Sequence, residues 1–430
     1  MKIIVGLLVL VFFIYFFNWC SDNNTDDTLL FNKEVAFKRL ASKTPYEFVR
    51  NYHENNITSS YSGCEYIHSW FLIRHGTRYP GQKNMFQITH GLEEIKKIYP
   101  HLLGDFPSIL HLKEYLFSNL HPEGEKEMIE LAERYKILFP KLFSDEHDFQ
   151  KYKFFTTQTQ RTFRSKYFFT IGLYNRQVAA RIPHDTSMEK VLRFYKHCSK
   201  WNNNYKKIMT RKNKMFEESD LFKKNVLESF SMRHKLENIM SAQNITVLYN
   251  VCRYGQAWNP QVFFEPWCPL FTPEEMSILE YREDVLDYWE DGIESEINYR
   301  PACVLITHLL ESLKDPLKAT VNFSHSRAIR KFLVLLKYLD DKFALDVDNY
   351  LLFKNSRKWR GSFVYPFGAN IAIVVRNCQS PNISKTIGLF LNENLIQIPG
   401  CNEKWCDYYK FIEIMSQLNK NCDLSAFCDS

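Results

Sequence analysis

Arg74-His75-Gly76-Thr77-Arg78-Tyr79-Pro80 is the stretch from which the rest of this sequence can be interpreted. It follows an apolar run over residues 67–73 that predicts a buried strand. A guanidinium binds phosphate through paired hydrogen bonds and keeps its charge, and a histidine with one unprotonated ring nitrogen can attack phosphorus. The motif therefore predicts a phosphoryl site, although a loop histidine between two solvated arginines would also fit it.

Two other segments place similar residues at similar positions. Residues 318–324 predict a second strand, followed by His325 and by apolar residues at helical spacing. Residues 152–156 predict a third strand, and Arg161 follows it just before a helical pattern. In open α/β sheets the ligand lies beyond the carboxyl ends of the strands. We therefore expect these loops to meet, although His325 taken alone would more often be a core histidine.

On these residues the chain resembles a known family. The stretch 74–80 is similar to the signature of the histidine acid phosphatases, and residues from about Phe48 to Phe411 resemble specifically the multiple inositol polyphosphate phosphatases. The wider likeness is carried by Gly124–Glu127, Thr159–Thr162, Tyr288–Gly292, Glu296–Tyr299, Ala302–Cys303, Phe367–Ile371, Leu391–Glu393 and Pro399–Cys401. The resemblance implies an α/β fold, with a central mostly parallel sheet flanked by helices and an inserted helical subdomain.

The resemblance also implies a phosphomonoesterase that works through a covalent phosphohistidine. His75 would attack phosphorus, and His325 would donate a hydrogen bond to the phosphoryl group. The arginines that would hold its oxygens are Arg74, Arg78 and Arg161. The implied substrates are inositol hexakisphosphate and related polyphosphates, with 2,3-bisphosphoglycerate as a further candidate. No metal or other cofactor is expected, because the arginines supply the positive charge. Lys83 would bind a second phosphate or remain a solvated lysine.

One departure from the family pattern concerns the proton donor. The family typically carries His-Ala-Glu at the second histidine, whereas this chain has His325-Ser326-Arg327. Arginine is a poor proton donor, and general acid catalysis typically contributes ~10² to 10⁴ in rate. The alternative function is therefore a weak or inactive polyphosphate-binding pseudophosphatase, in which Arg327 is an added substrate ligand. A phosphoryl-transfer mutase is a third hypothesis, which an exported chain disfavours.

Length and composition suit a large packed domain. The chain has 430 residues, 45% of them hydrophobic and 16% aromatic, with a formal net charge of +6. This charge is compatible with an anionic small-molecule substrate, and we predict no nucleic-acid partner. We predict a phosphatase domain over residues 48–411, with an α/β core at about 64–192 and 305–411. A helical insert would span about 193–304, and residues 412–430 would form a cysteine-containing tail.

The N-terminus predicts export. Residues 1–20 contain an apolar run that suits a signal peptide, or a signal anchor if it is not cleaved. The domain would then lie in the endoplasmic reticulum lumen, be secreted, or be anchored at the cell surface, with membrane contact only in the uncleaved form. Glycosylation sequons begin at Asn23, Asn56, Asn244, Asn322 and Asn382. We expect Asn322 to be buried in its strand and unmodified.

The cysteines agree with an oxidising compartment. Ten of the 11 cysteines follow Cys20, and an even number in an exported chain predicts up to five disulfides. Cys401/Cys406 and Cys422/Cys428 are the candidates for local bridges. A zinc site is the weaker alternative, because no Cys-x-x-Cys or His-x-x-x-His spacing accompanies the cysteines.

Overall fold

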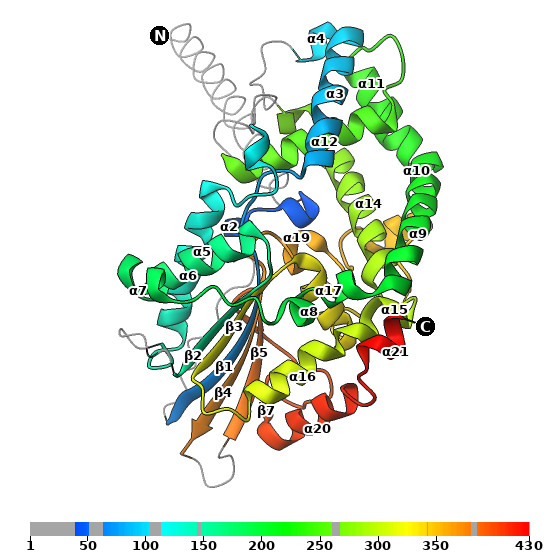
Figure 1. Ribbon diagram of the computed structural model, residues 1–430. Coiled ribbons are helices and arrows are strands. Elements are labelled where there is room, and N and C mark those ends of the chain that lie inside the picture. The colour runs from blue at the N-terminus through cyan, green and yellow to red at the C-terminus, as the bar shows by residue number, and fades with distance from the viewer. Residues whose placement is uncertain are drawn as a thin grey trace, which may run out of the picture.

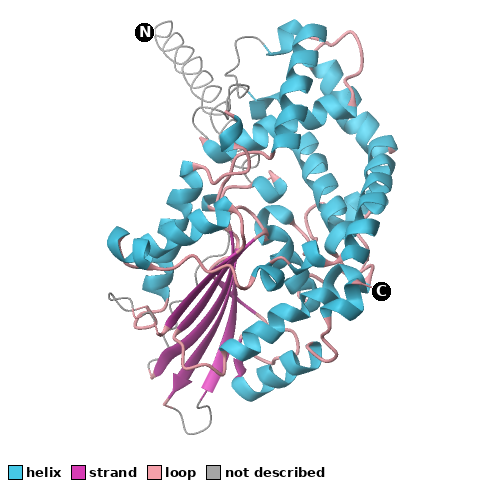
Figure 2. Cartoon of the chain, in the orientation of Figure 1, coloured by secondary structure: helices cyan, strands magenta, loops and turns pink. Residues whose placement is uncertain are grey.

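The strands gather into one sheet, and helices cover both of its faces and one of its ends (Figure 1, Figure 2). The computed structural model describes residues 39–50, 63–103, 113–143, 148, 150–259, 267–341, 343–379 and 385–429. The strands are β1 (Cys64–Arg74), β2 (Tyr152–Thr156), β3 (Ala319–Ser324), β4 (Asn370–Cys378), β5 (Lys385–Leu391), β6 (Asn394–Ile396) and β7 (Trp405–Asp407). The predicted N-terminal signal segment lies outside the described residues.

The sheet has the order β2-β3-β1-β4-β5-β6, with β7 paired to β5. The pairs β1/β3 and β2/β3 are parallel, whereas β4 is antiparallel to β1 and to β5. The expected α/β fold with a helix-flanked central sheet is confirmed, but the sheet is mixed rather than mostly parallel. The fully apolar run at the start of β4 is typical of a parallel strand. Here it arises because an antiparallel strand is buried on both faces.

Successive side chains of β1 point to opposite faces of the sheet, so their contacts show which helices cover each face. Trp70 packs against Phe332 of α17 and His308 of α16, whereas the next residue, Phe71, packs against Tyr135 of α5. Figure 1 shows α5 and α6 on one side of the sheet and α16 and α20 on the other. The bounds are α5 (Pro122–Leu138), α6 (Gln160–Leu173), α7 (Arg176–Arg181), α16 (Cys303–Ser312), α17 (Ser326–Leu335), α19 (Gly361–Val364), α20 (Tyr408–Leu418) and α21 (Leu424–Cys428).

The remaining helices form a layer beyond the end of the sheet at which β1 stops (Figure 1). They include α3 (Gln82–Ile98), α4 (Pro100–Leu103), α8 (Glu189–Leu192), α9 (Ser199–Glu218), α10 (Asp220–Phe222), α11 (Ser229–Arg233), α12 (Ala242–Trp258), α14 (Pro273–Asp291) and α15 (Glu296–Tyr299). Shorter elements are η1 (Ala41–Lys43), α2 (Glu47–Arg50), η3 (Glu114–Leu116), η4 (Phe194–His197), η5 (Lys223–Glu228), η6 (Cys268–Leu270), η7 (Arg300–Ala302), η8 (Val347–Asn349) and α18 (Tyr350–Phe353). None of the helices formed by the described residues could cross a membrane by length and apolarity.

Residues on both sides of the predicted insert boundary build this layer. Helix α3 precedes residue 193 but packs on α12, where a Cβ at Gly91 would lie 2.6 Å from Val247 Cγ2. At the other end, α20 runs across the predicted boundary at 411/412. The helical layer therefore includes α3, which lies within the first predicted part of the core. The domain limits remain a prediction.

Five disulfides use all ten cysteines after Cys20. The bridge Cys401–Cys406 is confirmed, but the expected Cys422–Cys428 bridge is wrong. The bridges are Cys64–Cys378, Cys198–Cys428, Cys252–Cys268, Cys303–Cys422 and Cys401–Cys406. Asn322 is fully buried and donates to Phe71 O, as expected for an unmodified strand residue.

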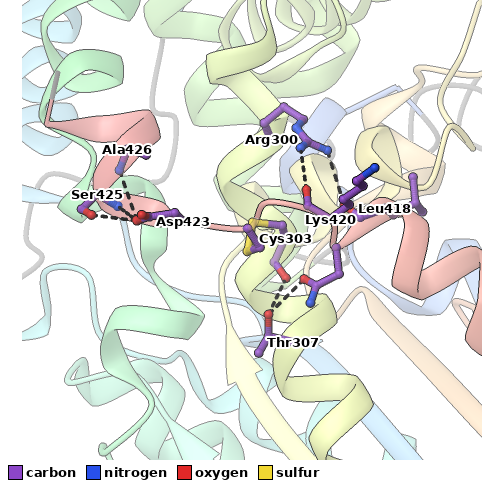
Figure 3. Close-up of a disulfide and its surroundings, with 10 residues drawn as sticks. Arg300, Cys303, Thr307, Leu418, Lys420, Asp423, Ser425 and Ala426 are labelled. Carbon is purple, nitrogen blue, oxygen red and sulfur yellow. Dashed lines mark hydrogen bonds between the residues drawn. A yellow bond between two sulfur atoms is a disulfide. The ribbon is translucent and has the colours of Figure 1, made fainter.

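The C-terminal segment is fixed by bonds beside one of these bridges (Figure 3). Arg300 of η7 donates to the carbonyls of Leu418 and Lys420 next to Cys303–Cys422. Asp423 then caps α21 by accepting from the Ser425 and Ala426 amides. This geometry directs Cys428 toward Cys198 at the start of α9, so the short sequence distance between Cys422 and Cys428 does not make them partners.

Candidate active site

The ends of three parallel strands lie level at the edge that faces the helical layer. Arg74 pairs with Ser324, and Thr156 pairs with Phe323, so the last residues of β1, β3 and β2 share one register. The first residue after β1, His75, donates its amide to Ser324 O at 3.1 Å. His75, Thr157 and His325 therefore leave the sheet side by side. The sequence predicts that His75 and His325 meet here, but it does not single out Thr157.

Two glycines let helix α5 approach the His75 loop closely. A Cβ at Gly76 would lie 2.5 Å from Gly124 O, and a Cβ at Gly124 would lie 2.2 Å from Thr77 O. Glu127, one turn further along α5, accepts from the Thr77 amide at 2.6 Å and from the Thr77 hydroxyl at 2.8 Å. Burial raises the pKa of Glu127 to about 7, although the hydrogen bonds from Thr77 and Tyr46 oppose this shift. This contact fixes the loop that carries the predicted nucleophile.

The His75 ring is oriented for attack through Nε2. Its Nδ1 lies 2.9 Å from Gly76 O, and a carbonyl can only accept, so Nδ1 carries the proton. Nε2 is then unprotonated. Burial and the positive charges of Arg161 and Arg74 hold the pKa of His75 well below its ordinary value. The side chain is thus a neutral imidazole with a free lone pair, which is the form that a nucleophile needs.

His325 lies directly against His75, with ring centroids 5.4 Å apart. Arg161 Nη2 lies 3.4 Å from His325 Nδ1, and because a guanidinium only donates, Nδ1 is the acceptor. The Nε2–H then faces Thr157 Oγ1 at 3.1 Å. Burial, followed by Arg161 and Arg193, lowers the pKa of His325 well below its ordinary value. The predicted second histidine is therefore also a neutral donor.

Arg74 and Arg78 donate hydrogen bonds to backbone carbonyls rather than to carboxylates. Arg74 donates through Nη1 to the carbonyls of Ser42 and Tyr365, at 2.7 and 2.6 Å, and lies over the Phe367 ring. Arg78 donates to Tyr79 O at 2.7 Å. Among the described residues, no carboxylate forms an ion pair with Arg74, Arg78 or Arg161. Cations held without carboxylates leave an anionic ligand as their partner.

Burial and the positive charges of neighbouring arginines lower the pKa values of Arg74 and Arg161. Burial and the neighbouring Arg78 lower the pKa of Arg74 to about 9. The same two causes lower the pKa of Arg161 to about 10. A phosphoryl group placed between them would relieve this repulsion, which makes the binding of a doubly charged anion favourable.

Two predicted ligand residues do not join this group. Lys83 is exposed in the first turn of α3. In the described part of the chain, it has no recorded contact with Arg74, His75, Arg78, Arg161 or His325. Arg327 binds Glu290 of α14 and lies over the rings of Trp201 and Tyr205, at 5.2 and 5.4 Å. Its charge is thus neutralised within the helical layer. A substrate-binding role for either residue stays a prediction.

Sequence reasoning missed several residues that the fold adds to the site. Glu127 carries no sequence signal of its contact with Thr77 beyond its family likeness, and Thr157 follows a predicted strand without a motif of its own. Arg193 influences the pKa of both Arg161 and His325 from the loop after α8. Tyr254 of α12 influences the pKa of Arg74 and Arg161. The last two lie far from the motifs in sequence, and no local pattern singled them out.

The family is shown by the match of residues 68–392 to the model of the histidine phosphatase superfamily (branch 2). This chain belongs to that superfamily. The expected recognition is confirmed, and the protein is a phosphatase. Among curated proteins, it is 27% identical over 418 residues to multiple inositol polyphosphate phosphatase 1 of Drosophila melanogaster, covering 90% of this chain and 87% of the relative. It is 25% identical over 409 residues to the Homo sapiens protein of the same name, covering 85% and 82%.

Solved structures share the fold. The phytase from D. castellii matches with a TM-score of 0.74 at 17% identity, over 92% of this chain and 88% of that one. A Bifidobacterium longum multiple inositol polyphosphate phosphatase, solved as a complex with inositol hexasulfate, matches with a TM-score of 0.65 at 15% identity. That match covers 90% of this chain and 98% of the other.

Proposed function

We propose that this phosphatase removes phosphate from inositol polyphosphates through a phosphohistidine formed on His75. The observation that carries the proposal is the hydrogen bond from His75 Nδ1 to Gly76 O, which leaves Nε2 unprotonated. Three arginines that form no ion pair with a described carboxylate lie around this histidine. Curated relatives named as multiple inositol polyphosphate phosphatases support the substrate class. A small-molecule polyphosphate is therefore the proposed partner.

The reaction proceeds in two displacements. Nε2 of His75 forms a bond to phosphorus while the bond to the leaving oxygen breaks. Arg74, Arg78 and Arg161 stabilise the charge on the non-bridging oxygens, and His325 donates through Nε2–H. Water then attacks phosphorus, the bond to Nε2 breaks, and inorganic phosphate leaves. The pKa values of both histidines are well below the ordinary histidine value, so both side chains stay neutral in mildly acidic solution. The first step can therefore proceed there.

A polyphosphate-binding protein without turnover is the less favoured function. That hypothesis placed Arg327 beside the substrate, whereas Arg327 is paired with Glu290. For the location, five disulfides suit an oxidising compartment. We propose the endoplasmic reticulum lumen or the cell exterior, with membrane attachment only if the N-terminal segment is retained.

The test is a rapid-quench experiment with labelled inositol hexakisphosphate. Quenched protein should carry acid-labile, alkali-stable phosphate, and purified enzyme should release phosphate in steady state. His75→Ala should lose both signals. His90→Ala is the matched control, since this exposed histidine of α3 contacts Glu94 and Phe86 rather than the motif residues. Label that persists in His75→Ala would rule out His75 as the nucleophile.

A further inference from the structure

The source of the leaving-group proton is not at position 327. Arg327 is held by Glu290 and surrounded by the rings of Tyr195, Trp201 and Tyr205. An alkoxide leaves phosphorus slowly unless it is protonated, so another group near the arginines must supply the proton if the proposed function holds. The inference below rests on that function.

The other titratable groups around the motif are committed elsewhere. Glu127 accepts hydrogen bonds from Thr77 and from the Tyr46 amide with its two oxygens. His75 is the nucleophile, and the Nε2–H of His325, which faces Thr157 in the structure, turns to the non-bridging phosphoryl oxygens in the proposed mechanism. Beside Arg161, burial raises the pKa of Tyr195, which makes it a poor proton donor. Around Arg74 and Arg78, Tyr254 and Lys43 are the described groups whose pKa is lowered to about 8.

Tyr254 lies on the face of α12 that packs on the Arg78 loop. Trp258, one turn later on the same face, donates through Nε1 to Arg78 O at 3.2 Å and packs against Tyr79. The rings of Tyr254 and Trp258 are 5.8 Å apart. Tyr254 is completely buried, and its hydroxyl has no hydrogen-bond partner in the described part of the chain, so its proton is not already donated to another group.

Three cations around Tyr254 stabilise its phenolate. Arg78 comes from the loop after β1 and Arg253 from α12 itself. Lys43 of η1 lies with Nζ 5.9 Å from the ring centroid. Burial alone would raise the pKa of Tyr254, but these neighbours outweigh it and lower the pKa to about 8. A phenol in that range still holds its proton at neutral pH and releases it readily.

We propose that Tyr254 is the general acid that protonates the leaving oxygen of the substrate. As Nε2 of His75 bonds to phosphorus, the electron pair of the breaking P–O bond moves to the leaving oxygen, which takes the phenolic proton. The resulting phenolate is stabilised by Arg78 and Lys43. In the second step the attacking water gives a proton back to the phenolate, and the enzyme returns to its starting state.

The test uses the dependence of rate on the leaving group. Glycerol 2-phosphate needs a proton donor, whereas 4-nitrophenyl phosphate releases an anion that is stable without one. Tyr254→Phe should lower kcat for glycerol 2-phosphate by ~10² to 10⁴, and lower kcat for 4-nitrophenyl phosphate by less than ~10. Tyr249→Phe is the matched control, because it removes a hydroxyl from the same helix that only donates to Arg39 O, at 2.7 Å. Its rates on both substrates should equal those of the wild type.

A second measurement does not depend on turnover. Absorbance titration of the phenolate should show one tyrosine that ionises near pH 8 in the wild type and in Tyr249→Phe, but not in Tyr254→Phe. Equal losses on both substrates in Tyr254→Phe would overturn the proposal, as would no loss on either. A loss confined to glycerol 2-phosphate in Lys43→Arg, instead of Tyr254→Phe, would assign the proton to Lys43. If the wild type hydrolysed neither ester nor inositol hexakisphosphate, the proposed function itself would fail.

Discussion

Replacing Arg327 with Met should destabilise the protein without impairing catalysis. The change leaves Glu290 buried with Arg330 as its remaining partner, at 3.2 Å. Breaking a buried ion pair costs ~3–5 kcal/mol, and the lower part of this range applies because the Arg327 side chain is 26% exposed. The lost contacts with the Trp201 and Tyr205 rings add ~0.5–1 kcal/mol each, although the Met side chain replaces part of their packing. We expect the free energy of unfolding to fall by about 4 kcal/mol in total.

The assay is equilibrium unfolding in urea with the disulfides intact, combined with kcat for 4-nitrophenyl phosphate. For a chain of this size the midpoint should fall by about 1 M urea, while kcat stays unchanged. Arg327→Glu should lose more stability, because it places a second carboxylate beside Glu290, and it should gain no rate. Unchanged stability together with a tenfold weaker affinity for inositol hexakisphosphate would refute this reasoning. Arg327 would then face the substrate.

Three further predictions concern acidity and the disulfides. Because the pKa of His75 is held well below its ordinary value, its imidazole stays unprotonated as the pH falls; lowering the pH from 6.5 to ~5.5 should not slow phosphoenzyme formation, and a rate that falls with an apparent pKa near the free-histidine value would contradict this. Removing Cys64–Cys378, which closes a separation of 314 residues, should cost about 3–4 kcal/mol more than removing Cys401–Cys406, with a separation of 5; equal midpoints for the two double serine variants would contradict the loop-entropy argument. Thiol titration of denatured, unreduced protein should find Cys20 at most, and several reactive thiols would contradict an oxidising compartment.

The parallel half of the sheet could be predicted from the sequence because its signals are local. Residues 152–156 form β2 as predicted, and β3 covers residues 319–324 of the predicted 318–324. The strand-end rule then sufficed to bring His75, His325 and Arg161 together. Strand direction could not be predicted for β4, since burial on both faces removes the alternation that marks an antiparallel strand.

The parts that the sequence did not reveal depend on partners far along the chain. Arg327 meets Glu290 across 37 residues, and nothing near either residue indicates the pair. Tyr254 reaches the Arg78 loop only because α3 and α12 pack together at Gly91 and Val247. Cys422 pairs with Cys303 rather than with its near neighbour because Arg300 and the Asp423 cap fix the direction of the chain between them. Such contacts depend on how distant segments pack together, and the local spacing of apolar residues does not predict that packing.

The two bridges of the C-terminal segment set the order in which this protein can mature. Cys422 and Cys428 are the last cysteines of the chain, and they close onto Cys303 and Cys198, which are 119 and 230 residues earlier. Chains are made from the N-terminus, and early domains can fold during synthesis. Cys198 and Cys303 therefore cannot reach their native partners before residues 422–428 have been synthesised, and a variant truncated before Cys428 would leave Cys198 without its native partner.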